Sequence, residues 1–121
     1  MSIAAALRLS TAPRAVRQPN EFDRMRVART LEQRTRYRYV APSVEPVVDG
    51  YLVRSPCCSR RIDPAGGEID VALLLWDEER RDWLLYRRDH GAACWIEDGR
   101  FARLGELLVR LNTDPARVFW Q

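Results

Sequence analysis

The hydrophobic residues in the first third of the chain recur with the period of an α-helix. Apolar side chains occur at intervals of three residues, at Phe22, Met25, Ala28 and Leu31. Asn20 precedes them as a preferred N-cap, and Glu21 and Asp23 would lie in the first turn, where the helix dipole favours anions. This pattern predicts a helix over residues 21–34.

A period of two follows, which is typical of half-buried β-strands. Arginine alternates with tyrosine in residues 36–40, and Pro42 and Pro46 interrupt the segment after it. Further strands are predicted over 51–54, 69–76, 83–88 and 92–96. Because short turns join the last three segments, we expect them to form an antiparallel meander.

Leucines at helical spacing return near the C-terminus and predict a helix over residues 99–112. Asp114 and Pro115 have the pattern of another helix start, an acidic N-cap before proline. Phe119 and Trp120 are expected to anchor the chain end by burying large apolar areas. The predicted fold is α+β, an antiparallel β-meander sheet with one N-terminal and one C-terminal helix packed on it.

The composition is that of a globular protein, with 46% hydrophobic and 31% charged residues. A chain of 121 residues is long enough for one domain, which we expect over 21–121 after a flexible tail over 1–20. The tail carries three arginines and no acidic residue, so it accounts for the whole net charge of +3. Its composition also resembles an organelle transit peptide, which is the alternative interpretation.

No apolar stretch approaches the roughly 18 residues that a membrane helix needs, so no membrane partner is expected. The apolar run at 3–7 is shorter than the hydrophobic region of a secretory signal. The three cysteines show no disulfide-framework spacing. These features predict a cytoplasmic protein.

Three segments carry a family resemblance: Trp83-Leu84-Leu85-Tyr86, the stretch 107–112 and the ending 114–121. Over about residues 21–121 they resemble a bacterial family of small proteins, the domain of unknown function 3024. The resemblance implies a bacterial origin and the extent of the domain, and it transfers no activity or catalytic residue. The chain departs from the family's common pattern at its cysteines and histidine.

The cysteines and the single histidine form a candidate metal site. Cys57 and Cys58 are adjacent, and three residues separate His90 from Cys94. One imidazole and three thiolates match the ligands of structural zinc, whereas adjacent cysteines in an extended chain point to opposite faces. The alternative is that one of the adjacent cysteines is buried, the other is a surface thiol, and Cys94 belongs to the sheet core. We expect no cofactor, with zinc as the alternative.

Catalytic residues are not predicted. A thiolate at Cys57 or Cys58 would need His90 as its base, and nothing in the sequence brings them together. Glu68 and Asp70 would project from one face of a strand, but no third ligand completes an acidic site. These observations favour a non-catalytic protein.

Arginines and tyrosines between positions 24 and 39 form a candidate surface for single-stranded nucleic acid. These residues are Arg24, Arg26, Arg29, Arg34, Arg36, Tyr37, Arg38 and Tyr39. Arginine binds phosphate and aromatic rings stack on bases, although the same alternation also suits an ordinary strand. The leading interpretation is a small non-catalytic interaction or accessory domain with a protein partner.

Overall fold

The computed structural model describes residues 17–35, 41–56 and 67–120, which form an α+β fold. Its elements are α2 (Glu21–Leu31), β1 (Ser43–Val47), β2 (Gly50–Pro56), β3 (Glu68–Asp77), β4 (Asp82–Asp89), β5 (Cys94–Phe101) and α3 (Leu104–Thr113). The strands form one sheet in the order β1-β2-β3-β4-β5, and every neighbouring pair is antiparallel. The predicted fold class and meander are confirmed, and the sheet is larger than the three-stranded meander expected.

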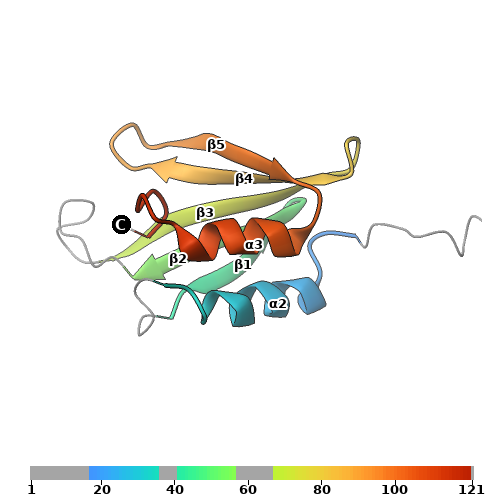
Figure 1. The fold of residues 1–121 in the computed structure, drawn as a ribbon, viewed down its shortest axis with the longest axis horizontal. Coiled ribbons are helices and arrows are strands. Elements are labelled where there is room, and N and C mark those ends of the chain that lie inside the picture. The colour runs from blue at the N-terminus through green and yellow to red at the C-terminus, as the bar shows by residue number, and fades with distance from the viewer. Residues whose placement is uncertain (1–16, 36–40, 57–66, 121) are drawn as a thin grey trace, which may run out of the picture.

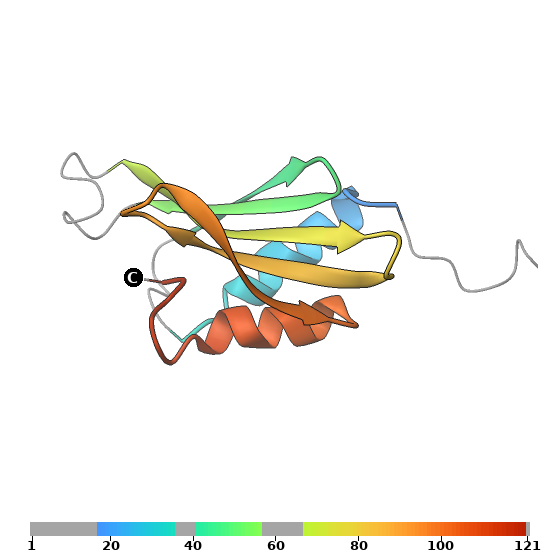
Figure 2. The same ribbon diagram turned by 90° about the horizontal axis from the view of Figure 1, so that it is seen from above.

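Both helices pack on the same face of the sheet (Figures 1 and 2). Helix α2 lies against β1, α3 lies against β4 and β5, and the two helices contact each other. The core between the layers contains Tyr51, Leu74 and Leu85 from the sheet, together with Leu31 and Leu107 from the helices. The opposite face of the sheet is therefore not covered by either described helix.

The N-terminal helix begins at its predicted cap. The side-chain oxygen of Asn20 accepts the backbone N–H of Asp23 at 2.8 Å. The buried Tyr51 hydroxyl accepts the backbone N–H of Asn20 at 2.9 Å and donates to the side chain of Gln18 at 2.5 Å. Gln18, which precedes the helix cap, is thus hydrogen-bonded to the sheet through Tyr51.

The predicted helix 21–34 is three residues too long. After Leu31 the backbone tightens, because the N–H groups of Glu32, Gln33 and Arg34 bond to carbonyls only three residues earlier. The backbone N–H of Thr35 then bonds to the carbonyl of Asn112 in α3. This bond ties the end of α2 to the end of α3.

The proline-bearing segment before Gly50 is a strand, contrary to our prediction of an interrupted segment. Pro46 lies in β1, opposite Tyr51 of β2. Because β1 is an edge strand, its proline need not remove a hydrogen bond from the sheet. The strand predicted over 36–40 lies outside the described residues.

The C-terminal helix starts later than predicted. Gly99, Arg100 and Phe101 remain in β5 and pair with β4. Helix α3 begins at Leu104, where Glu106 accepts the backbone N–H of Arg103 at 3.1 Å. Arg110 of α3 then makes two hydrogen bonds to Asp98 of β5, at 3.0 and 2.8 Å.

No helix forms at Asp114 and Pro115, where a further helix start was predicted. The Asp114 carboxylate instead accepts the backbone N–H groups of Val118, Phe119 and Trp120, at 2.9, 3.0 and 2.8 Å. These bonds fold the chain back on the end of α3, so Phe119 and Trp120 are buried as expected.

Candidate functional site

We define the open face as the side of the sheet opposite the two helices. Its centre is a strip of half-buried apolar side chains, the apolar strip, which consists of Leu52, Leu73, Leu75, Leu84 and Tyr86. They share this face because side chains alternate along a strand and residues paired across strands lie on one side. The strip lies on β2, β3 and β4, the three central strands of the sheet, and its two ends are the ends that follow the direction of β3.

The sequence of β3 explains why this strip exists. Residues 71–76 are all apolar, whereas a strand with one solvated face normally alternates. Val71, Ala72 and Leu74 are buried in the core, while Leu73 and Leu75 are half-buried on the open face. The strand therefore has the composition of one that is buried on both faces.

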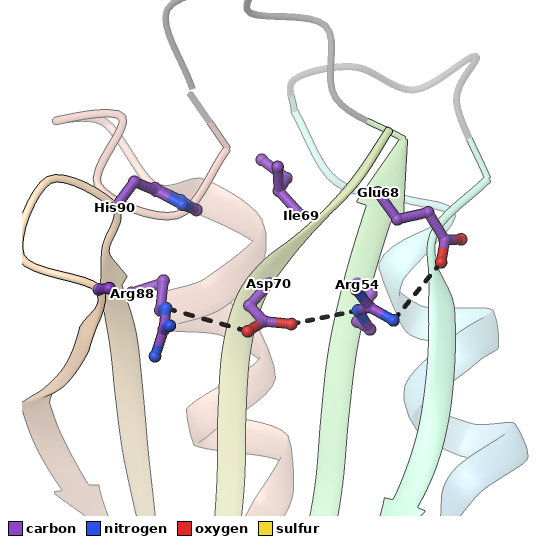
Figure 3. Close-up of a pocket in the computed structure, with 7 residues that line it drawn as sticks. Arg54, Glu68, Ile69, Asp70, Arg88 and His90 are labelled. Atoms are coloured by element: carbon purple, nitrogen blue, oxygen red, sulfur yellow. Dashed lines mark hydrogen bonds and ion pairs between the residues drawn. The ribbon is translucent and has the colours of Figure 1, made fainter. Parts of the chain in front are cut away.

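Three charged side chains meet at one end of the strip (Figure 3). The Asp70 carboxylate lies 3.1 Å from Nε of Arg54 and 3.9 Å from Nε of Arg88. We call this group the basic triad, because it contains two guanidinium groups and one carboxylate. Glu68 adds a longer contact to Arg54, at 3.7 Å.

A β-bulge positions Asp70 in this triad. Val53 pairs with Ala72, but the next residue, Arg54, pairs with Asp70, so Val71 is an extra residue in β3. The extra residue reverses the alternation and turns Asp70 to the open face, beside Arg54. Glu68 and Asp70 both reach Arg54, in agreement with the prediction that they project from one strand face.

A pocket of about 250 Å³ lies beside the basic triad. Its lining consists of Arg54, Glu68, Ile69, Asp70, Arg88, His90 and Ala93. His90 follows β4 and points toward Ile69 (Figure 3). Burial lowers the pKa of the His90 imidazole from its ordinary value of 6.5, and the positive charge of Arg88 lowers it further. At neutral pH the pocket therefore offers a neutral imidazole beside paired charges, which suits binding of polar groups.

A second charged group lies at the other end of the strip. Nη1 of Arg100 lies 3.1 Å from the Asp77 carboxylate and 2.8 Å from the Asp82 carboxylate. We call it the acidic triad, because it contains two carboxylates and one guanidinium group. The backbone N–H of Arg80 is the main cause that lowers the pKa of Asp77, and the hydrogen bond from Arg100 acts in the same direction.

An aromatic ring lies beside the basic triad. The guanidinium carbon of Arg88 is 5.1 Å from the centre of the Trp95 ring, a cation–π distance. Trp95 is half-buried in β5 and pairs with Arg88 of β4. The open face thus combines an aromatic edge, an apolar centre and two charged ends.

The structure describes only half of the predicted zinc ligands. His90 lines the pocket, and Cys94 is exposed at the start of β5. Cys57 and Cys58 lie outside the described residues, so the four-residue set stays a prediction. Within the described ranges, no three His, Cys, Asp or Glu side chains are grouped to hold a metal ion. The alternative that Cys94 belongs to the sheet core is wrong, because its side chain is exposed.

The predicted nucleic-acid residues fall in different environments. Arg26 and Arg29 are exposed on α2, whereas Arg24 is paired with Glu21. Arg34 keeps only 1% of its surface exposed, so it is a core residue and not part of a surface for phosphate. Arg36, Tyr37, Arg38 and Tyr39 lie outside the described residues.

Sequence reasoning missed the two triads as sites. Arg88 belongs to a pair of adjacent arginines in the sequence, but nothing near it in the chain indicates that it contacts the Asp70 carboxylate. The partners of Arg54 and Arg100 depend on strand register, which two bulges shift. The uninterrupted apolar run of β3 was the available signal for the open face.

Comparisons with known proteins give the family and nothing finer. Neither described helix is long and apolar enough to cross a membrane. No curated protein and no solved structure matches the chain. A family model described as Domain of unknown function (DUF3024) matches residues 15–121, which is most of the sequence. The chain therefore belongs to this family.

Proposed function

We propose that this chain is a small non-catalytic interaction domain that binds a protein surface through its open face. One observation carries the proposal: β3 is apolar on both sides, but the described helices cover only one side. Apolar side chains that stay in contact with water forgo the free energy that burial would supply. A partner on the open face would supply that burial.

The chemistry of the face supports a protein partner. Interfaces between proteins commonly have an apolar centre with aromatic residues and a polar, charged rim. Here the apolar strip forms the centre, Trp95 lies at its edge, and the two triads form the rim. The paired charges of the triads and the neutral His90 fit the mixed polar groups of a protein surface. A cytoplasmic location is part of this proposal.

The charge of the face does not fit nucleic acid. The two triads together contain three guanidinium groups and three carboxylates, and Glu68 and Glu97 add negative charge at exposed positions. Nucleic-acid binding needs an excess of cations to replace the counterions of phosphate. The open face has no such excess among its described residues.

Weak binding of single-stranded nucleic acid stays the alternative, on a different surface. The exposed side chains of Arg26 and Arg29 on α2 support it, and the undescribed residues 36–39 belong to the same expected surface. Its affinity would fall steeply with added salt. An absence of any shift of a labelled oligonucleotide at low salt would exclude it.

Site-specific photocrosslinking in the source cell tests the proposed function. A photoreactive phenylalanine analogue replaces Leu75 on the open face or, as the matched control, Val109, which is 62% exposed on α3. We expect position 75 to crosslink to a discrete protein and position 109 to give no such product. Equal products at both positions, or none at position 75, would overturn the proposal. Mass spectrometry of the product identifies the bound protein.

A further inference from the structure

We infer that the partner on the open face is a second copy of this chain, an inference that rests on the proposed function. The two ends of the apolar strip carry triads of opposite composition. At one end Asp70 lies between Arg54 and Arg88, and at the other end Arg100 lies between Asp77 and Asp82. Such a surface is complementary to itself.

The charges of the triads have opposite sign. Two guanidinium groups with one carboxylate leave the basic triad with an excess positive charge, and the reverse holds for the acidic triad. Glu68 reduces this excess at the basic end. Its contact with Arg54 is 3.7 Å and its side chain is 52% exposed, more than any triad side chain, so water screens its charge most.

A two-fold axis that lies between the two faces and crosses β3 at a right angle, at the middle of the strip, would pair these ends. In an isologous dimer the same patch is used by both subunits, so the basic triad of each copy meets the acidic triad of the other. Asp70 and Asp77 are seven positions apart along β3, which corresponds to about 23 Å at about 3.3 Å per residue. Because the spacing is the same in both copies, both charge contacts form in one arrangement while the apolar strips pack between them.

The edges of the sheet are poorly suited to self-association, which favours the face. Pro46 interrupts the hydrogen-bonding capacity of β1 at one edge. At the other edge, β5 contains a bulge where Leu85 pairs with Gly99 and Tyr86 pairs with Glu97. Prolines and bulges are features that natural edge strands use against strand addition.

Charge reversal tests the dimer with three variants of the full chain. Arg88→Asp leaves one guanidinium group and two carboxylates in the basic triad, and Asp82→Arg makes the opposite change in the acidic triad. Each single variant places like charges together at both ends of the dimer. The double variant R88D/D82R exchanges the two triads and restores opposite charges. Arg26→Glu, at an exposed position of α2, is the control for net charge.

Sedimentation equilibrium measures the outcome, and circular dichroism checks that each variant is folded. We expect the wild-type chain and the Arg26→Glu control to dimerise with similar dissociation constants. Each single reversal should raise the dissociation constant by about tenfold or more, and the double variant should recover most of this loss. Added salt should raise the dissociation constant of the wild-type dimer. It should not lower the dissociation constant of either single variant to the wild-type value.

Two results would overturn the inference. One is a wild-type chain that stays monomeric at about 100 µM, a concentration that populates all but weak dimers. The other is a dimer that both single reversals leave unchanged. A monomeric chain that still crosslinks a different protein from position 75 would remove the second copy and keep the interaction domain. The absence of any crosslink at that position would remove both.

Discussion

The guanidinium carbon of Arg34 lies 4.5 Å from the centre of the Trp120 ring, and both side chains are almost completely buried. Nη1 of Arg34 donates to the carbonyl of Leu31 at 2.8 Å, and Nε1 of Trp120 donates to the carbonyl of Leu111 at 2.9 Å. A planar cation on an indole face is a favourable pair when little water reaches it. The stack thus links the ends of both helices to the end of the chain.

Removal of the Trp120 ring should destabilise the fold. We expect Trp120→Ala to lower the free energy of unfolding by about 3–5 kcal/mol, because a large aromatic leaves a cavity in the core. Urea unfolding followed by circular dichroism gives this value. Arg117→Ala, at an exposed position of the same segment, is the control and should change stability by about 0.5 kcal/mol or less. A Trp120→Ala protein as stable as the wild type would contradict the anchoring role.

Asp114 should be required for the closing turn. We expect Asp114→Ala to lower the free energy of unfolding by about 3 kcal/mol, because it removes the acceptor of three backbone N–H groups, two of them buried. Asp114→Asn should cost less, since one oxygen acceptor remains and asparagine tolerates the positive φ of 27° at this position. Hydrogen exchange should accelerate at Phe119 and Trp120 in the alanine variant. Equal stability of the two variants would argue against these bonds.

Stability should depend on pH through His90. Burial lowers the pKa of the folded imidazole, so below the ordinary value of 6.5 the unfolded chain binds a proton that the folded chain does not. The free energy of unfolding should therefore be highest above 6.5, decrease as the pH falls below it, and level off once the pH has passed the folded pKa. Urea titrations at several pH values measure this slope.

The variant His90→Gln controls for the carboxylates that also titrate in acid. It should lack the part of the slope that begins near pH 6.5, while keeping the part at lower pH. The resonances of the single imidazole in an NMR titration report its pKa directly. A His90 pKa at or above 6.5 in the folded protein would contradict the effect of burial.

Cys94 should react with a thiol reagent in the native protein, because its side chain is exposed. Peptide mapping after brief labelling identifies the modified position, and Cys94→Ser is the control that loses the label. Labelling without a chelator, together with a lack of stoichiometric zinc in elemental analysis, would exclude the Cys57, Cys58, His90 and Cys94 site. Labelling that starts only when zinc is removed would support that site.

The regular parts of the fold could be predicted because their signals are local. Apolar residues at helical spacing and a good N-cap gave α2, and short turns between apolar runs gave the meander of β3, β4 and β5. Strand β1 was missed because Pro42 before it and Pro46 within it weigh against a strand, a rule that does not apply at a sheet edge.

The candidate site could not be predicted because it depends on register. Asp70 contacts Arg54 and Arg88 because of the way residues pair across β2, β3 and β4. Composition and spacing along the sequence do not reveal this pairing. Arg34 shows a related limit of local patterns, since an arginine after a helix has the expected features of a surface residue. It packs on the ring of Trp120, which lies 86 positions later in the chain.

The position of Asp70 on the open face, and with it the charge pattern there, depends on the bulge at Val71. If β2 and β3 paired regularly through Val71, without the bulge, simple alternation would turn Asp70 to the side of Ala72 and Leu74, beneath the helices. A carboxylate would then enter the core without its arginines, and the basic triad would lose its centre. A family member that lacks one residue here has nothing to bulge, so its aspartate would reach the same open face by simple alternation.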